Sequence, residues 1–223
     1  DRAHPLRPGP AVSGVLRGPA TKLALTLAVV CLAVPAAGQP VGGKPPTGAR
    51  VDYHVHPKGG LSVEDALRRS RESGIYYGLA INGGLGQPAP GDAGAEAFLA
   101  ELAGKPVYKA FQAEGREWVG LFSNATLAKF DYIFTDGMTW SDDAGRRMRL
   151  WMPDEVGTIA DPQRFMDMLV DRTVGIVTRE PIDIYVNSTY IPDQLTAQYD
   201  ALWTPARMRR VVDALASSGV AME

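Results

Sequence analysis

Two histidines stand one residue apart in the stretch VDYHVHPKGG, residues 51–60, of a chain that holds only three. If this stretch is a strand, His54 and His56 point to the same side, because side chains alternate along a strand. Neutral imidazole is a common ligand for divalent Zn, Mn or Fe, and carboxylates complete such sites. The pair therefore indicates a metal site. The alternative is a surface pair, or two structural histidines held by hydrogen bonds.

Polar side chains stand at or just after the end of each stretch that we predict to be a complete strand. They are Lys58, Asn82, Gln112, Glu114, Thr135, Asp136 and Asn187. The carboxyl ends of parallel strands meet at one edge of a sheet, which is where (β/α) barrels hold their active sites. We therefore expect Glu114 and Asp136 to be the carboxylates nearest to the histidine pair, and hence further metal ligands.

Other roles remain open for these residues. Glu114 could cap the following helix or pair with Arg116, and Asp136 could be a turn residue before Gly137. Lys58 could bind an anionic substrate group or be solvated. The glycines in NGGLG, residues 82–86, could offer backbone N–H groups to a phosphate or simply form a turn.

We predict a surface loop between residues 140 and 155. We expect its four carboxylates to belong to a solvated acidic loop; they are Asp142, Asp143, Asp154 and Glu155. Trp140 and Trp151 flank this loop and either line a pocket rim or pack internally, which is the default for tryptophan.

The elements that must position these residues alternate along the chain. Short apolar strands are predicted at 51–55, 76–81, 107–112, 132–135 and 182–187, and a sixth begins at 220. Amphipathic helices are predicted at 62–74, 92–104, 124–130, 161–179 and 204–219. This alternation is typical of βαβ units and a parallel sheet, so the fold class is α/β. About five and a half units favour an unfinished (β/α) barrel, the rest of it lying beyond this fragment; the alternative is an open sheet ending in a stub.

The first strand should sort its residues by face. Asp52, His54 and His56 share one face, and we expect them at the mouth of the barrel. Val51, Tyr53 and Val55 share the other, which suits the helix layer.

The N-terminal region resembles an export signal. Residues 21–40 hold a cation, an apolar run from Leu23 to Val34 and then Pro-Ala-Ala-Gly, which are the three parts of a secretory signal. The alternative is a buried helix or a misread upstream sequence. We predict an N-terminal extension and signal peptide over 1–40, a linker over 41–50 and the barrel domain over 51–223. After cleavage no stable membrane insertion is expected.

Charge and cysteine content narrow the class of protein. The net charge is −2, and it becomes −5 without residues 1–40, which hold four cations and one anion. This excludes the basic footprint of a nucleic-acid-binding protein. The only cysteine, Cys31, lies in the signal, so no internal disulfide forms. An exported, acidic, cysteine-free domain is consistent with a bacterial periplasm or exterior.

The stretch DYHVHPKGGLSVEDALRRSRESGIYYGLAING resembles the PHP (polymerase and histidinol phosphatase) superfamily, in particular an exported PHP-like group. The shared features are an Asp-x-His-x-His start, a helix after it and a strand close behind. FQAEGREW, residues 111–118, resembles the second motif of the family, in which a glutamate follows a strand.

The resemblance implies a distorted (β/α)7 TIM-like barrel with one to three divalent metals and metal-activated water that attacks a phosphoester of a small molecule. His54 and His56 would be ligands and Glu114 a further one. Asn187 stands where members often carry a histidine after a middle strand, and would be a weaker, neutral ligand. The late His and Asp-x-His motifs have no counterpart. The alternatives are an amidohydrolase-type enzyme acting on a C–N or lactone bond, and a non-catalytic exported barrel with a degenerate site.

Overall fold

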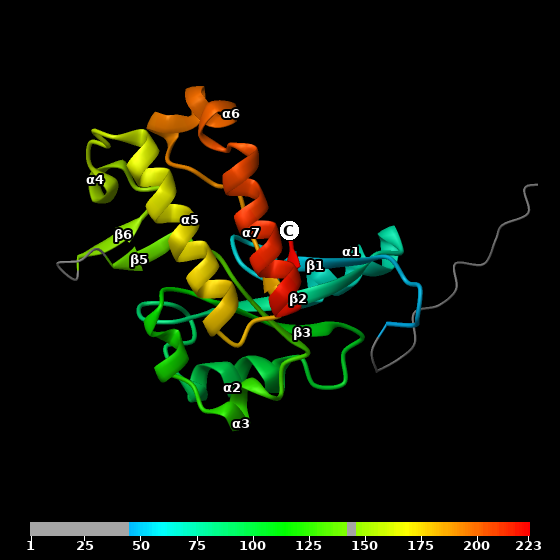
Figure 1. Ribbon diagram of the computed structural model, residues 1–223. Coiled ribbons are helices and arrows are strands. Elements are labelled where there is room, and N and C mark those ends of the chain that lie inside the picture. The colour runs from blue at the N-terminus through cyan, green and yellow to red at the C-terminus, as the bar shows by residue number, and fades with distance from the viewer. Residues whose placement is uncertain (1–44, 142–145) are drawn as a thin grey trace, which may run out of the picture. The chain divides into compact units, whose positions relative to one another are not determined.

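Six parallel strands form the main sheet of the computed structural model (Figure 1). They are β1 (Val51–Val55), β2 (Tyr76–Gly83), β3 (Tyr108–Ala113), β4 (Tyr132–Thr135), β7 (Ile184–Tyr185) and β8 (Ala221–Met222). Their order in the sheet is β1-β2-β3-β4-β7-β8, so β1 and β8 are the two edges. The sheet curls into a half-barrel, which confirms the α/β class.

The structure describes residues 45–141 and 146–223. The predicted N-terminal extension and signal over 1–40, residues 41–44 of the predicted linker, and Asp142 and Asp143 therefore lie outside the described residues. No helix within the described ranges is both long and apolar enough to cross a membrane.

Seven α-helices connect the strands of the described chain. They are α1 (Val63–Ser73), α2 (Asp92–Glu101), α3 (Asn124–Leu127), α4 (Pro153–Val156), α5 (Pro162–Arg179), α6 (Tyr199–Leu202) and α7 (Pro205–Ser218). Two 3₁₀ helices, Glu117–Gly120 and Asp193–Gln198, complete the connections. The helices begin and end where cap chemistry predicts: Ser62 and Thr204 accept from backbone N–H groups of the first turn, and Gly74 and Gly219 end α1 and α7 in the left-handed conformation.

The helices cover one face of the sheet. Their apolar sides form one core cluster with strand residues such as Leu79, Phe111 and Ile133. Figure 1 shows α5 and α7 packed side by side, and the buried Arg207 joins them by donating to Asp167 and to the backbone oxygen of Gln163. Burial of these apolar faces is the main force that holds the layer together.

The opposite, inner face of the sheet carries a second and smaller cluster. It consists of Ala80, Ala110, Tyr132, Phe134 and Val186, with Tyr108 and Ile184 packed against it. The inner face is thus aromatic at its centre, and it borders an open groove of about 740 Å³.

The first strand departs from strict alternation. Val51 and Asp52 pair with Tyr76 and Tyr77, but Val55 pairs with Leu79, so β1 holds one extra residue at this point. Such a bulge shifts the phase of the side chains that follow. The assignment of Val51, Tyr53 and Val55 to one face is therefore wrong. Val55 packs against the helix-side core as predicted, whereas Val51 and Tyr53 line the inner groove.

Two short strands flank residues 142–145, where the sequence predicts only an acidic loop. β5 (Thr139–Ser141) and β6 (Arg147–Arg149) form an antiparallel pair. Trp140 is buried and its ring packs near Phe165, so packing and not a pocket rim is its role. Glu155 is not simply solvated, because it accepts from the Arg149 guanidinium and backbone N–H.

Candidate metal centre

The polar residues at the strand ends come together at one edge of the half-barrel, as the sequence predicts. Neighbouring strands are parallel and in close register: Asn82 lies opposite Gln112, and Gln112 lies opposite Phe134. The residues just beyond these positions therefore reach the same edge. Each strand that contributes a candidate is fixed by the helix-side core beneath it.

His56 has a defined protonation pattern. Its Nδ1 lies 3.1 Å from the backbone oxygen of Ala80, and a carbonyl oxygen only accepts, so Nδ1 carries the proton. Nε2 is then the unprotonated nitrogen; it is buried and has no hydrogen-bond partner among the described residues. Burial, the charge of Lys58 and the neighbouring His54 lower the pKa of His56 to about 4, which the nearby Gln112 offsets only in part. At neutral pH its Nε2 lone pair is available.

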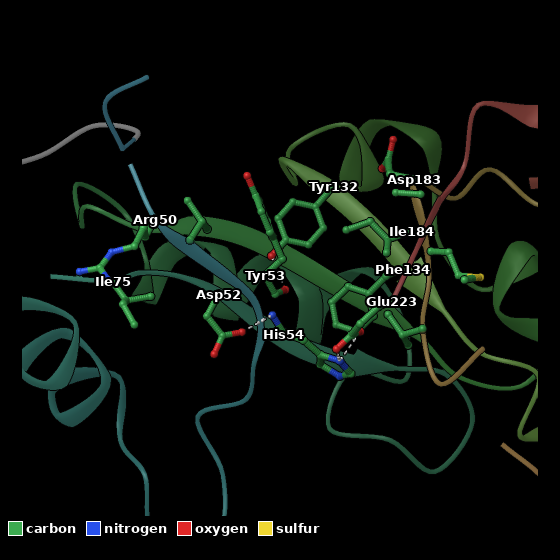
Figure 2. A pocket seen from close by; sticks show the side chains of 14 residues that line it. Arg50, Asp52, Tyr53, His54, Ile75, Tyr132, Phe134, Asp183, Ile184 and Glu223 are labelled. Atoms are coloured by element: carbon green, nitrogen blue, oxygen red, sulfur yellow. Dashed lines mark hydrogen bonds and ion pairs between the residues drawn. The ribbon is translucent and has the colours of Figure 1, made fainter. Parts of the chain in front are cut away.

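His54 lies beside it, on the inner side of the sheet. The two imidazole centroids are 5.2 Å apart, and the His54 ring meets the Phe134 ring edge-on at 4.6 Å. The backbone N–H of His54 donates to the Asp52 carboxylate at 3.1 Å (Figure 2). The two histidines thus converge on one place, which the bulge in β1 does not prevent.

Glu114 is a buried carboxylate just beyond the end of β3, and only 8% of its surface is exposed. Its Oε1 accepts from the Asn82 amide at 2.8 Å, which leaves Oε2 for another partner. Burial and the negative charge of Asp136 raise the pKa of Glu114 to about 7, although Lys58 and Arg116 act in the opposite direction. It neither caps a helix nor forms an ion pair with Arg116, so two of its alternative roles are wrong.

Asp136 follows β4 and is 5% exposed. Burial raises its pKa, and the backbone N–H of Met138 and the side chain of Asn187 counter this by donating to its two oxygens at 2.9 and 3.2 Å. His54 and Arg116 are close enough to favour its charged form. Asp136 is thus both the turn residue that the alternative interpretation predicts and a neighbour of His54.

Asn187 adopts an unusual backbone conformation. Its φ is 52°, the only positive φ of a residue other than glycine among the described residues. Such conformations are uncommon and cluster at functional sites. Here the conformation directs the Asn187 amide toward Asp136, so the structure places Asn187 at the site as a hydrogen-bond donor.

Lys58 and the glycines of residues 82–86 are the two candidates for binding an anion, and they lie in different environments. Lys58 is exposed, and its charge reaches both His56 and Glu114. Together with His56 and Asn82 it lines a cavity of about 310 Å³ beside the site. The N–H of Gly84, in contrast, donates to the backbone oxygen of Ala89, so it is used within the turn and does not face a ligand.

Gly84 has a positional role instead. Its φ is 150°, and a Cβ at this position would come within 2.3 Å of the backbone oxygen of Glu114. The glycine therefore permits the close approach of two strand ends, which brings Asn82 within hydrogen-bond distance of Glu114.

The charge of Arg116 lies near the two buried carboxylates, Glu114 and Asp136. It donates to Glu180 at 3.0 Å and to the Thr135 hydroxyl at 2.7 Å, and Trp118 donates to the same Glu180 at 2.7 Å. These partners hold the guanidinium in place. Arg116 thereby supplies positive charge near Glu114 and Asp136.

The donor set is of the kind that divalent cations take. The two imidazoles are neighbours, the Asp136 carboxylate lies near both His54 and Glu114, and the buried Nε2 of His56 has no partner among the described residues. Across residues 45–141 and 146–223, no three His, Cys, Asp or Glu side chains already form a group with metal-binding geometry. The residue types and the His56 tautomer fit a divalent metal.

Sequence reasoning missed one residue at this site. The side chain of Glu223, directly after β8, reaches the imidazole of His54 (Figure 2). The available signal was the one used elsewhere, because the predicted strand that begins at 220 is followed closely by the carboxylate of Glu223. Because β1 and β8 are opposite edges of the sheet, only the curl of the half-barrel brings the two residues together.

Comparisons with known proteins add no relative to this description: no family model matches the chain, and neither the curated proteins nor the solved structures contain a match.

Proposed function

We propose that the protein is a metal-dependent hydrolase, acting on a phosphoester of a small molecule at the mouth of the half-barrel. The observation that carries the proposal is the state of His56: its Nδ1 donates to Ala80, and its buried Nε2 has no partner among the described residues, close to His54. Metal-binding histidines commonly donate their second ring nitrogen to a carbonyl or carboxylate in this way.

His54, His56 and Glu114 would hold the cation, with Asp136 and Asn187 as further oxygen ligands. A bound divalent cation such as Zn, Mn or Fe would supply Lewis acidity that lowers the pKa of water toward about 7 and polarises the phosphoryl group. In the alternative in which Glu114 does not bind the cation, its Oε2, which makes no hydrogen bond to Asn82, would accept the proton of the attacking water. Lys58 is placed to offset the charge of the phosphoryl oxygens.

The family, the complete fold and the export of the protein also belong to this proposal. The resemblance of the His-x-His stretch to PHP proteins supports phosphoester hydrolysis over amide or lactone hydrolysis. In the same proposal, the half-barrel is a portion of a (β/α)7 barrel, and the protein is exported by way of residues 1–40.

A binding-only site is the second candidate, and one observation favours it. Each buried carboxylate already accepts an amide hydrogen bond, Glu114 from Asn82 and Asp136 from Asn187. Because the pKa of Glu114 is about 7, this carboxyl group is partly protonated at neutral pH. The two buried carboxyl groups therefore do not require a cation to balance their charge.

A substrate panel separates these candidates. The full chain, loaded in turn with Zn²⁺, Mn²⁺ or Fe²⁺, is assayed on aryl phosphate monoesters and diesters and on aryl amides and lactones. We expect phosphoester turnover that His56→Gln abolishes. Turnover of amides or lactones alone would favour an amidohydrolase, and metal binding without turnover of any substrate would favour the binding-only site.

A further inference from the structure

Glu223 makes a two-oxygen contact with the imidazole of His54. Its Oε2 lies 2.8 Å and its Oε1 3.1 Å from the same nitrogen, Nδ1. The residues come from the opposite edges of the sheet, and Figure 2 shows the carboxylate directed at the ring across the inner groove. The His54 side chain is 22% exposed and that of Glu223 52%, so the contact lies at the rim of the groove.

This contact specifies where the ring proton lies. A carboxylate oxygen accepts, so Nδ1 of a neutral His54 carries the proton and Nε2 keeps its lone pair. His56 shows the same arrangement through a different acceptor, the backbone oxygen of Ala80. In both histidines Nε2 is therefore unprotonated, and its lone pair is available to a metal ion.

Other contacts hold the His54 ring without selecting its proton position. The Phe134 ring packs against it at 4.6 Å, and Asp52 binds only the backbone N–H. Among the described residues, Glu223 is the one hydrogen-bond partner of the His54 imidazole. The tautomer of His54 therefore depends on Glu223.

We infer that Glu223 is a positioning residue that fixes the orientation and Nδ1–H tautomer of His54, so that Nε2 faces the metal site. The inference rests on the proposed function in so far as it concerns a metal. Carboxylate partners of metal-binding histidines typically contribute ten- to hundredfold in affinity.

Two readouts test the inference on the full chain. The first is the ¹⁵N NMR pattern of the imidazoles in metal-free protein, above the pH range in which histidine titrates, with His54 assigned by the signals missing from His54→Gln. The second is the affinity for Zn²⁺ alone. Glu223→Ala removes the acceptor, Glu223→Gln keeps a neutral one, and Glu72→Ala on the exposed side of α1 is the control.

We expect wild-type His54 to show the Nδ1–H tautomer and Glu223→Ala to shift it toward Nε2–H, with zinc affinity ten- to hundredfold weaker. Glu223→Gln should keep the tautomer and lose less affinity, and Glu72→Ala should match wild type. If Glu223→Ala does not fold, the intermediate loss in Glu223→Gln carries the test.

An Nε2–H tautomer in the wild type would overturn the inference. So would unchanged zinc affinity in a folded Glu223→Ala variant, or in Glu223→Gln if Glu223→Ala does not fold. The failure of the proposed function looks different: wild type would bind no zinc, while the tautomer of His54 would still follow the residue at position 223.

Discussion

His56 and Glu114 give the metal-free protein two opposite dependences of stability on pH. The pKa of His56 is lowered from 6.5 to about 4, so its contribution to stability is full above pH 6.5 and is lost as the pH falls toward 4. The pKa of Glu114 is raised from 4.5 to about 7, so its contribution is full below pH 4.5 and is lost as the pH rises through 7. Between pH 4.5 and 6.5 the two largely cancel.

Single substitutions separate the two contributions. A pKa that differs by about 2.5 between the folded and unfolded states corresponds to about 3 kcal/mol. For the buried Glu114 we take this as the upper limit, and for the less buried His56 solvent screening reduces it to about 1–2 kcal/mol. Relative to wild type, Glu114→Gln should therefore gain up to about 3 kcal/mol as the pH rises from 4.5 to 7. His56→Gln should lose about 1–2 kcal/mol as the pH rises from 4 to 6.5.

The assay is urea unfolding of the full chain with a chelator present, at steps of one pH unit between 4 and 8. Differences from wild type at each pH cancel the titration of the other groups, and Glu72→Gln, on the solvent side of α1, serves as the surface control. If both site variants follow the wild-type pH dependence in parallel, His56 and Glu114 do not occupy the environments described above.

Three further substitutions test the framework of the site and the packing of the helix layer. Gly84→Ala should destabilise the fold by about 1–3 kcal/mol and weaken zinc binding, because a Cβ there would overlap the backbone of Glu114; thermal unfolding and zinc titration measure both effects, and wild-type values would contradict the close approach. Asn187→Ala should be about 1 kcal/mol less stable than Asn187→Gly, since only glycine accepts the φ of 52° without strain, and equal urea midpoints would refute this. Arg207→Met should cost about 2–3 kcal/mol in urea unfolding, because it leaves the oxygen of Leu202 without its donor; a loss under 0.5 kcal/mol would be inconsistent with that bond.

The sequence predicts the elements well where local chemistry decides them. Ser62 with Gly74, and Thr204 with Gly219, mark the ends of α1 and α7 because caps act within one turn. The order of strands and helices follows from apolar periodicity, and the parallel sheet follows from that order.

Features that depend on long-range contacts are less predictable. The bulge in β1 arises from pairing with β2, so strict alternation misplaces Tyr53. The contact between His54 and Glu223 depends on the curl of the whole sheet, because β1 and β8 lie at opposite edges of the sheet and do not pair with each other. The hairpin of β5 and β6 consists of two three-residue strands, which are too short for a periodic signal.

The site lies between these two cases. The position of Glu114 and Asp136 at one edge follows from parallel topology and could be predicted from the sequence. Their burial and their amide donors Asn82 and Asn187 depend on contacts between residues far apart in the sequence, and the Gly84 N–H is used inside a turn whose geometry the sequence does not specify.

The central proposal is a divalent metal bound through the imidazoles of His54 and His56. Its most direct test is the metal content of the full chain after equilibration with Zn²⁺ and removal of excess ions, measured for wild type, for His54→Ala/His56→Ala, and for His4→Ala, which removes the third histidine of the sequence. We expect at least one zinc ion per chain in wild type and in His4→Ala, and none in the double variant. Equal zinc content in all three proteins would contradict the proposed metal centre.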